Sequence, residues 1–384
     1  MTVRVPKLPD SIERRLELAG VSRRDFVAFC SRLMVAAPFG LSLTNVLYAE
    51  EVAAKVVAAR RPSVIWLHNQ ECTGCTETLL RTSEPDLATL IFDLISLDYH
   101  ETVMAAAGHQ AEKALHDAMD ANDGKFICVC EGSVPLKDNG VYMQVGGKTG
   151  IKMIEEVTSR AAAVVAIGSC ASWGGVQSQG ENPTGAVGVH ELVKNKPVVR
   201  IPGCPPNPYV FLATALEFAT AGTVPELDAE GRPKFAYDRT IHEHCPRRAH
   251  FDSGRFVRSF GDEGHQQGWC LYAMGCKGPV THAACSTRHF NEVVDAWPIG
   301  VGSPCFGCTE KTVGFNLGLF ETATIQNAVP PNFYPAVDPA RGKLSALGAG
   351  AAGVVIGGAA MAGVIGWKAL NKVEDVESSS ETKE

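Results

Sequence analysis

Residues 242–308 contain four cysteine-bearing segments, HEHC (242–245), GWCLYAMGCKGP (268–279), AACS (283–286) and SPCFGC (303–308). Glycine and proline accompany several of the six cysteines, and few apolar runs in this stretch are periodic. Thiolates bind soft metals, and tight turns let backbone amides approach the sulfurs of a cluster. The sequence therefore predicts an irregular region that is held together by metal clusters.

Four more cysteines lie upstream, in CTGC (72–75), GSC (168–170) and PGCPP (202–206). Each segment follows a short apolar run that indicates a buried strand. Open α/β sheets bind their ligands beyond the carboxyl ends of the strands, so the three loops are expected to converge. One 4Fe–4S cluster is therefore expected between Cys72, Cys75, Cys170 and Cys204. Together with the downstream cysteines and His242, these donors suffice for three iron–sulfur clusters.

Apolar runs alternate with helical patterns over residues 62–235, which predicts an α/β domain with a parallel sheet and crossover helices. Strands are expected at 63–67, 126–130, 161–168 and 196–201, and helices at 77–80, 86–95, 150–160 and 208–221. The periodicity is lost beyond Gly222, so a domain boundary is expected at 230–240 and an irregular cluster domain over 236–335. Cys128 and Cys130 fall inside an expected strand and are interpreted as small buried hydrophobes.

The bulk composition excludes some classes of function. The chain has 384 residues, enough for about two domains. Its net charge of -7 argues against a nucleic-acid partner, whose binding face would be basic. Thirteen cysteines could form disulfides or bind metal, and the long α/β-like stretches between them favour metal. The glycine-rich segments lack the GxGxxG spacing, so a nucleotide site has little support.

The first 49 residues resemble an export signal. SRRDF (22–26) matches a twin-arginine signature, and a mildly apolar run over 27–47 follows it. That route exports folded proteins, which suits a chain that receives clusters before export. An ordinary amphipathic helix is the alternative. Cys30 lies in this signal.

Residues 344–370 carry a single charge, Lys368, and exceed the roughly 20 residues needed to span a membrane. The segment includes Gly353 and Gly357, a GxxxG spacing that offers a packing face. A buried soluble helix is the alternative, but so many glycines would make a poor one. A C-terminal transmembrane anchor is therefore expected, with residues 371–384 as a cytoplasmic tail and the main body outside the cytoplasm.

Six cysteine motifs, in their order along the chain, resemble those of the small subunit of membrane-bound periplasmic nickel–iron hydrogenases. The resemblance covers residues 63 to about 335, and the signal and anchor fit the same group. It rests on ECTGCTE (71–77), GSCASWGG (168–175), PGCPPNP (202–208), HEHC (242–245), GWCLYAMGCKGP (268–279) and PCFGC (304–308).

The resemblance implies a flavodoxin-like N-terminal domain and three clusters. The proximal 4Fe–4S ligands would be Cys72, Cys75, Cys170 and Cys204. The distal 4Fe–4S ligands would be His242, Cys245, Cys270 and Cys276. The medial 3Fe–4S ligands would be Cys285, Cys305 and Cys308. His244 competes with His242, but the HxxC spacing selects His242.

The resemblance also bears on the oxygen response. Three cysteines cannot complete a medial cubane, and Pro298 occupies the position where some relatives have a fourth cysteine. Oxygen-tolerant relatives carry two further cysteines at positions that correspond to Gly74 and Gly175. With glycine at both, an ordinary proximal cubane and an oxygen-sensitive or only partly tolerant enzyme are expected.

The implied function is electron transfer during hydrogen uptake. The nickel–iron centre would lie on a large partner subunit, so no catalytic residue is expected on this chain. Electrons would pass through the proximal, medial and distal clusters to a membrane cytochrome b or another quinone-linked subunit, on the periplasmic side of the bacterial inner membrane. Lys277 is interpreted either as a cation that guides the electron acceptor to this subunit, or as an ordinary solvated lysine. Glu71 and Glu77 are considered as proton carriers, or else as acids at the start of a helix.

Two alternatives remain at this point. An iron–sulfur subunit of a quinone-linked, respiratory-complex-type oxidoreductase would explain the first cysteine set but not the other two. A protein stabilised by disulfides or zinc would carry no redox chemistry. Zinc sites prefer paired CxxC units, and here the two CxxC units, 72–75 and 305–308, are far apart.

Overall fold

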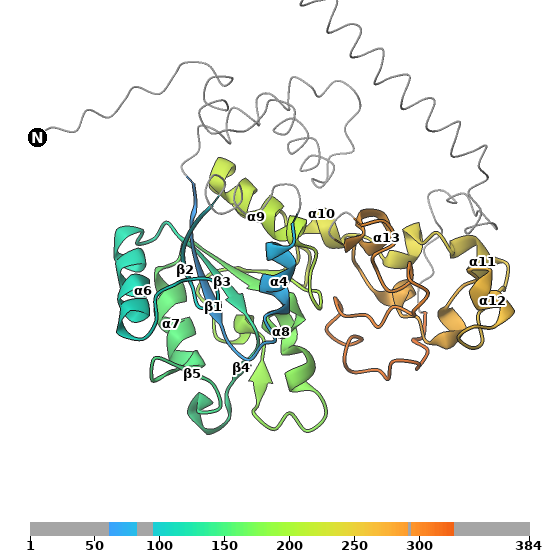
Figure 1. Ribbon diagram of the computed structural model, residues 1–384, viewed down its shortest axis with the longest axis horizontal. Coiled ribbons are helices and arrows are strands. Elements are labelled where there is room, and N and C mark those ends of the chain that lie inside the picture. The colour runs from blue at the N-terminus through green and yellow to red at the C-terminus, as the bar shows by residue number, and fades with distance from the viewer. Residues whose placement is uncertain (1–60, 83–94, 291–292, 326–384) are drawn as a thin grey trace, which may run out of the picture.

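The computed structural model describes residues 61–82, 95–290 and 293–325 (Figure 1). The expected signal with Cys30, most of the helix expected at 86–95, the anchor at 344–370 and the tail at 371–384 lie outside these residues. Within the described ranges, no helix combines the length and apolar character needed to cross a membrane.

A five-stranded parallel sheet forms the centre of the first domain (Figure 1). Its strand order is β2-β1-β3-β7-β9, so the chain starts near the middle and moves outward in both directions. This confirms the α/β fold with a parallel sheet. The strands are β1 (Ser63–His68), β2 (Ser96–His100), β3 (Ile127–Glu131), β7 (Ala163–Ile167) and β9 (Val198–Ile201).

Both faces of the sheet are covered by helices, because residues of the buried strands point alternately to the two sides. Ile65 and Leu67 of β1 pack in one core with α6 (His109–Ala121) and α7 (Gly150–Arg160). On the other face, Trp66 packs with helices α4 (Gly74–Leu80), α9 (Pro208–Ala221) and α10 (Lys234–Tyr237). The domain is therefore a three-layer α/β/α sandwich.

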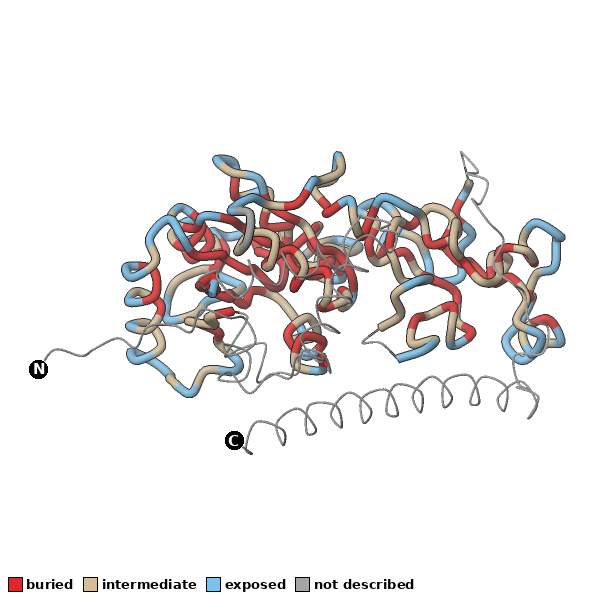
Figure 2. Tube along the Cα trace, turned by 90° about the horizontal axis from the view of Figure 1, so that it is seen from above, coloured by how far each residue is buried: buried red, intermediate tan, exposed pale blue. Residues whose placement is uncertain are grey.

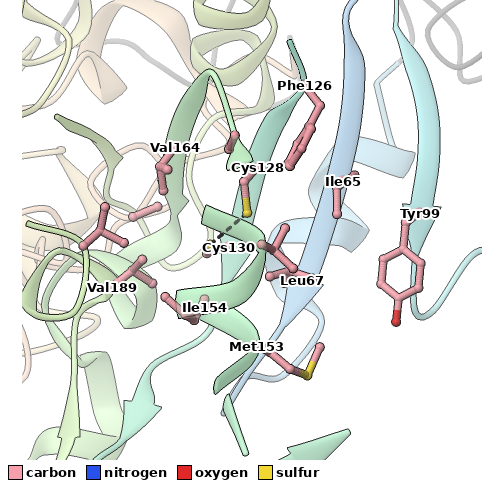
Figure 3. Close-up of a cluster of buried hydrophobic side chains, with 14 of the residues drawn as sticks. Ile65, Leu67, Tyr99, Phe126, Cys128, Cys130, Met153, Ile154, Val164 and Val189 are labelled. Carbon is pink, nitrogen blue, oxygen red and sulfur yellow. Dashed lines mark hydrogen bonds between the residues drawn. The ribbon is translucent and has the colours of Figure 1, made fainter. Parts of the chain in front are cut away.

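Cys128 and Cys130 of β3 lie in the first of these cores (Figure 3). Both side chains are fully buried, and their sulfur atoms are 3.7 Å apart. They pack among Ile65, Leu67 and Val164, apart from the other cysteines. Their interpretation as small buried hydrophobes is confirmed.

Local capping explains why two helices begin and end where the sequence predicts. Thr149 accepts a hydrogen bond from the Lys152 amide and starts α7. Asn207 caps α9, which has proline at its first position and is terminated after Ala221 by Gly222, a residue in the left-handed region with φ 69°. Both helices have the predicted bounds. In contrast, the sequence does not predict β2 or α6, and α4 begins at Gly74 rather than at residue 77.

The remaining elements of the first domain are short. They are the antiparallel pair β4 (Val134–Pro135) and β8 (Ala186–Val187), the hairpin β5 (Gln144–Val145) and β6 (Lys148–Thr149), α8 (Gly168–Trp173), and the 3-10 turns η3 (Lys137–Gly140), η4 (Gly175–Ser178) and η5 (Val189–Glu191).

Beyond Tyr237 the described chain has no element longer than five residues. Trp297 and Ile299 form a small core there together with Cys245, Cys276 and Cys305. Figure 2 shows this region as a separate lobe in which buried and exposed segments alternate along the chain. Its elements are η6 (Ile241–His244), α11 (Arg248–Asp252), α12 (Glu263–Gln266), η7 (Tyr272–Met274), η8 (Gly278–Val280) and α13 (Cys285–Arg288). The cysteines thus belong to the core of a lobe with little regular structure, as the sequence predicts.

Candidate metal centres

The first cysteine set gathers at the carboxyl edge of the sheet. Cys72 and Cys75 follow β1, Cys170 lies in α8 directly after β7, and Cys204 follows β9. The thiol of Cys75 interacts electrostatically with the other three. Burial raises the pKa of the Cys170 thiol to about 11, with a further contribution from Cys204. Burial also raises the pKa of the Cys75 and Cys204 thiols, so Cys75, Cys170 and Cys204 are neutral unless a metal stabilises their thiolate form.

Two glycines leave room around these sulfurs. A Cβ added at Gly168 would lie 2.5 Å from Cys75 Sγ, and one added at Gly175 would lie 2.5 Å from Cys170 Sγ. Both glycines have positive φ, 85° and 58°, which disfavours any side chain. Four thiols that gather at one edge of the sheet, with glycine backbone this close to their sulfurs, fit a 4Fe–4S cluster.

Glu131 is a residue of this site that the sequence does not predict. Its carboxylate is 1% exposed and accepts hydrogen bonds from the amides of Cys75 (3.0 Å) and Thr76 (3.3 Å) at the start of α4. Trp66 Nε1 (3.1 Å) and Thr76 Oγ1 (2.6 Å) complete its partners. The available signal is an acidic residue at the end of the apolar strand ICVCE, where a strand-end carboxylate can cap the neighbouring helix.

The second set lines one cavity in the irregular lobe. His242 lies in η6 and Cys245 directly follows that turn, whereas Cys270 and Cys276 flank η7 on its two sides. Burial lowers the pKa of His242 to about 4, so its imidazole is neutral, as a metal ligand must be. His244 lies elsewhere, with Nε2 2.9 Å from Arg239 Nη1.

The third set lies between the other two. Cys285 and Cys308 line a cavity of about 100 Å³ that also includes Cys204 and Pro298. The thiol of Cys305 interacts with both Cys285 and Cys308. It also interacts with Cys276 of the second set, and Cys308 interacts with Cys204 of the first.

A single serine hydroxyl connects the loops of the first and third sets. Ser169 Oγ accepts from the Gly203 amide (3.1 Å) and donates to the Cys308 carbonyl (2.6 Å). The Ser169 amide donates to the Gly203 carbonyl at 2.9 Å. Because Ser169 and Gly203 each adjoin a cysteine of the first set, this hydroxyl fixes both of their loops against Cys308.

A buried ion-pair network holds the third set from the other side. Arg232 donates through Nη1 to Glu310 Oε1 (2.8 Å) and to the carbonyl of Thr309 (3.1 Å). The same carboxylate oxygen accepts from the His282 amide at 2.8 Å. Asp228 Oδ2 accepts from Arg232 Nε at 2.7 Å. The network thereby ties the loops before Cys285 and after Cys308 to the segment that ends in α10.

The structure corrects the interpretation of Lys277. Its side chain is fully buried, so it is neither solvated nor available to guide an acceptor. Glu77 is more than half exposed and pairs with Arg81 on the first turn of α4, which agrees with the alternative of a helix-start acid. Glu71 is mostly buried and lies 3.2 Å from His68 Nδ1.

The chemistry of the donor sets favours clusters over the other kinds of site. All described cysteines are free, so the disulfide alternative has no support in this part of the chain. Within the same ranges, no three or more His, Cys, Asp or Glu side chains converge closely enough to hold one metal ion. Instead, one hollow is bordered by Cys245, Cys270 and Cys276, and another by Cys204, Cys285 and Cys308, as expected for ligands of a larger cluster.

Comparison with known families decides between the hydrogenase and respiratory-complex interpretations. The model of the NADH ubiquinone oxidoreductase 20 Kd subunit matches residues 72–218, and that of the C-terminal region of the NiFe/NiFeSe hydrogenase small subunit matches residues 237–321. The Hydrogenase-2 small chain of Escherichia coli (strain K12) is 46% identical over 361 residues, which cover 94% of this chain and 96% of the relative. The chain belongs to the hydrogenase small subunit family.

Other members of the family agree. The periplasmic [NiFe] hydrogenase small subunit 1 of Nitratidesulfovibrio vulgaris is 46% identical, covering 78% of this chain and 93% of the relative. The quinone-reactive Ni/Fe-hydrogenase small chain of Wolinella succinogenes is 45% identical, covering 80% and 85%. The reduced, active Ni-Fe-Se hydrogenase from Desulfomicrobium baculatum has a similar structure, with a TM-score of 0.64, 30% identity and coverage of 69% and 100%.

The protein is therefore the small subunit of a hydrogenase, and it pairs with a large subunit that bears the active site. Hydrogenase small subunits transfer electrons and carry iron–sulfur clusters. The first family match explains why the respiratory-complex alternative accounts for the first cysteine set. The second match, which contains the other two sets, excludes it as a description of the whole chain.

Proposed function

We propose that this chain carries electrons from H2 oxidation at the large subunit's NiFe site to the quinone pool of the membrane. The observation that supports this most strongly is the order of the three cysteine sets. The first set meets the third through Cys204 and Cys308, and the third meets the second through Cys305 and Cys276. The sets thus form one continuous series through the chain.

The ligand assignment follows from this series. The proximal 4Fe–4S cluster is held by Cys72, Cys75, Cys170 and Cys204. The medial 3Fe–4S cluster is held by Cys285, Cys305 and Cys308. The distal 4Fe–4S cluster is held by His242, Cys245, Cys270 and Cys276. When bound, the clusters supply one-electron transfer at potentials that depend on cluster type, charge and hydrogen bonding.

The protein's own residues position and insulate this path. The Ser169 hydroxyl and the Arg232–Glu310 pair fix the loops on two sides of the medial set. Burial of Cys305 and Cys276 keeps water from the junction of the medial and distal sets. Neutral His242 completes the donor set at the distal end of the series.

The proposed domains divide the cluster sites between them, with a targeting segment on either side. Residues 62–235 form a flavodoxin-like domain with the proximal site, supported by its strand order, second, first, third, fourth and fifth along the chain. Residues 236–335 form the cluster domain. Residues 1–49 act as a twin-arginine signal, and 344–370 as a transmembrane anchor that leaves 371–384 in the cytoplasm.

The acceptor is a membrane cytochrome b or another quinone-linked electron-transfer subunit on the periplasmic side of the inner membrane. The name of the quinone-reactive Wolinella relative supports a quinone route. The expected anchor would hold the cluster domain, which directly precedes it in the chain, close to the lipid. No nucleic-acid partner is proposed.

The test is to measure iron, sulfide and nickel, with EPR, on the heterodimer solubilised from membranes. The assignment predicts the sum of two four-iron clusters and one three-iron cluster, an oxidised three-iron EPR signal, and nickel only when the large subunit is present. Iron for a single cubane and no three-iron signal would contradict the medial and distal assignments. Zinc in place of iron would contradict the redox function itself.

A further inference from the structure

Lys277 is a completely buried lysine in the cluster lobe. Its Nζ donates to three backbone carbonyls, those of Gly318 (2.8 Å), Gly275 (3.2 Å) and Leu319 (3.2 Å). An ammonium group has three N–H donors, and here each of them has an acceptor. A neutral amine has only two and would leave one carbonyl without a partner. The site is therefore built for a cation.

This cation lies at the junction of the proposed medial and distal sets. Its charge interacts with the thiol of Cys305 and then with that of Cys276. The Lys277 backbone amide also donates to the Cys305 carbonyl at 2.8 Å. The same residue thus acts on one ligand from each set. The Lys277 charge also interacts with Glu321, but this acid is exposed and therefore largely screened by water.

We propose that Lys277 is a fixed positive charge that raises the reduction potentials of the medial and distal clusters together. This inference rests on the ligand assignment proposed above. Reduction adds one electron, and a nearby cation in a water-free site stabilises the more negative form. No proximal thiol is among the groups with which Lys277 interacts, so we expect the proximal potential to change least. Lys277 therefore favours electron flow away from the proximal site.

The test is an EPR-monitored redox titration of the intact heterodimer carrying Lys277→Met. Loss of the cation should change the reduction equilibria of the medial and distal clusters by about tenfold or more, a fall of about 59 mV for a one-electron couple. The proximal potential should change least. A merely structural role for Lys277 predicts no such selective shift.

Lys196→Met is a matched control. Its Nζ also donates to three carbonyls, those of Thr158, Ser159 and Ala161, but at the far end of α7. This variant should leave all three potentials unchanged. Equal potentials in the Lys277 variant and the wild type, or equal shifts in the two lysine variants, would overturn the proposal.

Lys277→Gln keeps the proposal testable if Lys277→Met loses its clusters, because its neutral amide still has two N–H donors for the backbone carbonyls. The medial and distal potentials should fall as they do in Lys277→Met. Wild-type medial and distal potentials in Lys277→Gln would then overturn the proposal. Absence of the two clusters from the wild type is a separate result, because it would contradict the ligand assignment and not the role of Lys277.

Discussion

Ser169 shows how much of the cluster arrangement depends on one side chain. Its hydroxyl is 1% exposed and both accepts from Gly203 and donates to Cys308. Replacing it by alanine leaves a buried amide and a buried carbonyl without partners, each costing about 1–3 kcal/mol. The loops of the proximal and medial sets would then be free to separate.

We therefore predict that Ser169→Ala lowers the thermal stability of the heterodimer and weakens the magnetic coupling between the proximal and medial clusters. The measurements are the unfolding temperature and the EPR line shape of the reduced proximal cluster, which the reduced, paramagnetic medial cluster broadens. Ser159→Ala is the control, because its exposed hydroxyl bonds only to the Glu156 carbonyl. A variant with the wild-type line shape would show that the hydroxyl does not set the spacing.

Gly175 offers a second prediction at the same scale. Gly175→Ala would place a Cβ 2.5 Å from Cys170 Sγ at a φ of +58°. We predict loss of the proximal cluster, seen as a fall in iron content and in its EPR signal. Gly180→Ala is the control that separates the clash with Cys170 from the backbone strain. Gly180 also has a positive φ, +60°, but nothing lies within 4 Å of the added Cβ. That control carries only the backbone strain, about 1–2 kcal/mol, and should keep its full iron content.

At the scale of elements, the sequence predicts those strands and helices that have an unambiguous pattern. The apolar strands β1, β3, β7 and β9 are all predicted, within two residues at either end. In contrast, β2 reads SLDYH, whose first three residues are only half-buried and include Ser96 and Asp98, so its composition does not indicate a strand. It is an edge strand stabilised by pairing with β1, and pairing is not visible in a local window.

The candidate sites likewise contain residues that the sequence predicts and residues that it does not. The cysteines themselves are evident from their spacing, and the structure brings the members of each expected set together. The supporting residues are not evident, because Glu131, Ser169 and Arg232 act on partners that lie 56, 139 and 78 residues away along the chain. The misinterpretation of Lys277 has the same cause, since its carbonyl partners include Gly318 and Leu319.

The Arg232–Glu310 pair joins the two lobes and leads to a prediction about how elements are held together. Arg232→Met leaves Glu310 with His282 as its remaining ion-pair partner and takes the cation from Asp228, and breaking a buried pair in this way costs about 3–5 kcal/mol. We predict a large fall in the unfolding temperature and preferential loss of the three-iron signal. Adding Glu310→Gln should recover part of the stability, because the uncompensated charge is then removed. A double variant no more stable than the single one would contradict this explanation.

At the scale of the whole molecule, the parts that transfer electrons and the part that would bind the membrane are separate along the chain. All the proposed cluster ligands lie among the described residues, and no helix in those ranges can span a bilayer. The apolar segment at 344–370 is the proposed anchor, and 35 residues separate it from the last proposed ligand, Cys308. Electron transfer within the heterodimer should not require this segment, whereas delivery to a membrane acceptor should.

We predict that truncation after residue 343 releases an intact heterodimer into the periplasmic fraction. Because the clusters are retained, it should oxidise H2 with a soluble artificial acceptor at the rate of the full-length protein. Hydrogen-dependent quinone reduction in membranes should be lost. The measurements are cell fractionation, iron content and both activities, with an Lys368→Gln variant of the full chain as control, since it keeps the apolar segment and should remain in the membrane. A truncated protein that stays membrane-bound and still reduces quinone would show that attachment and acceptor docking reside elsewhere in the heterodimer.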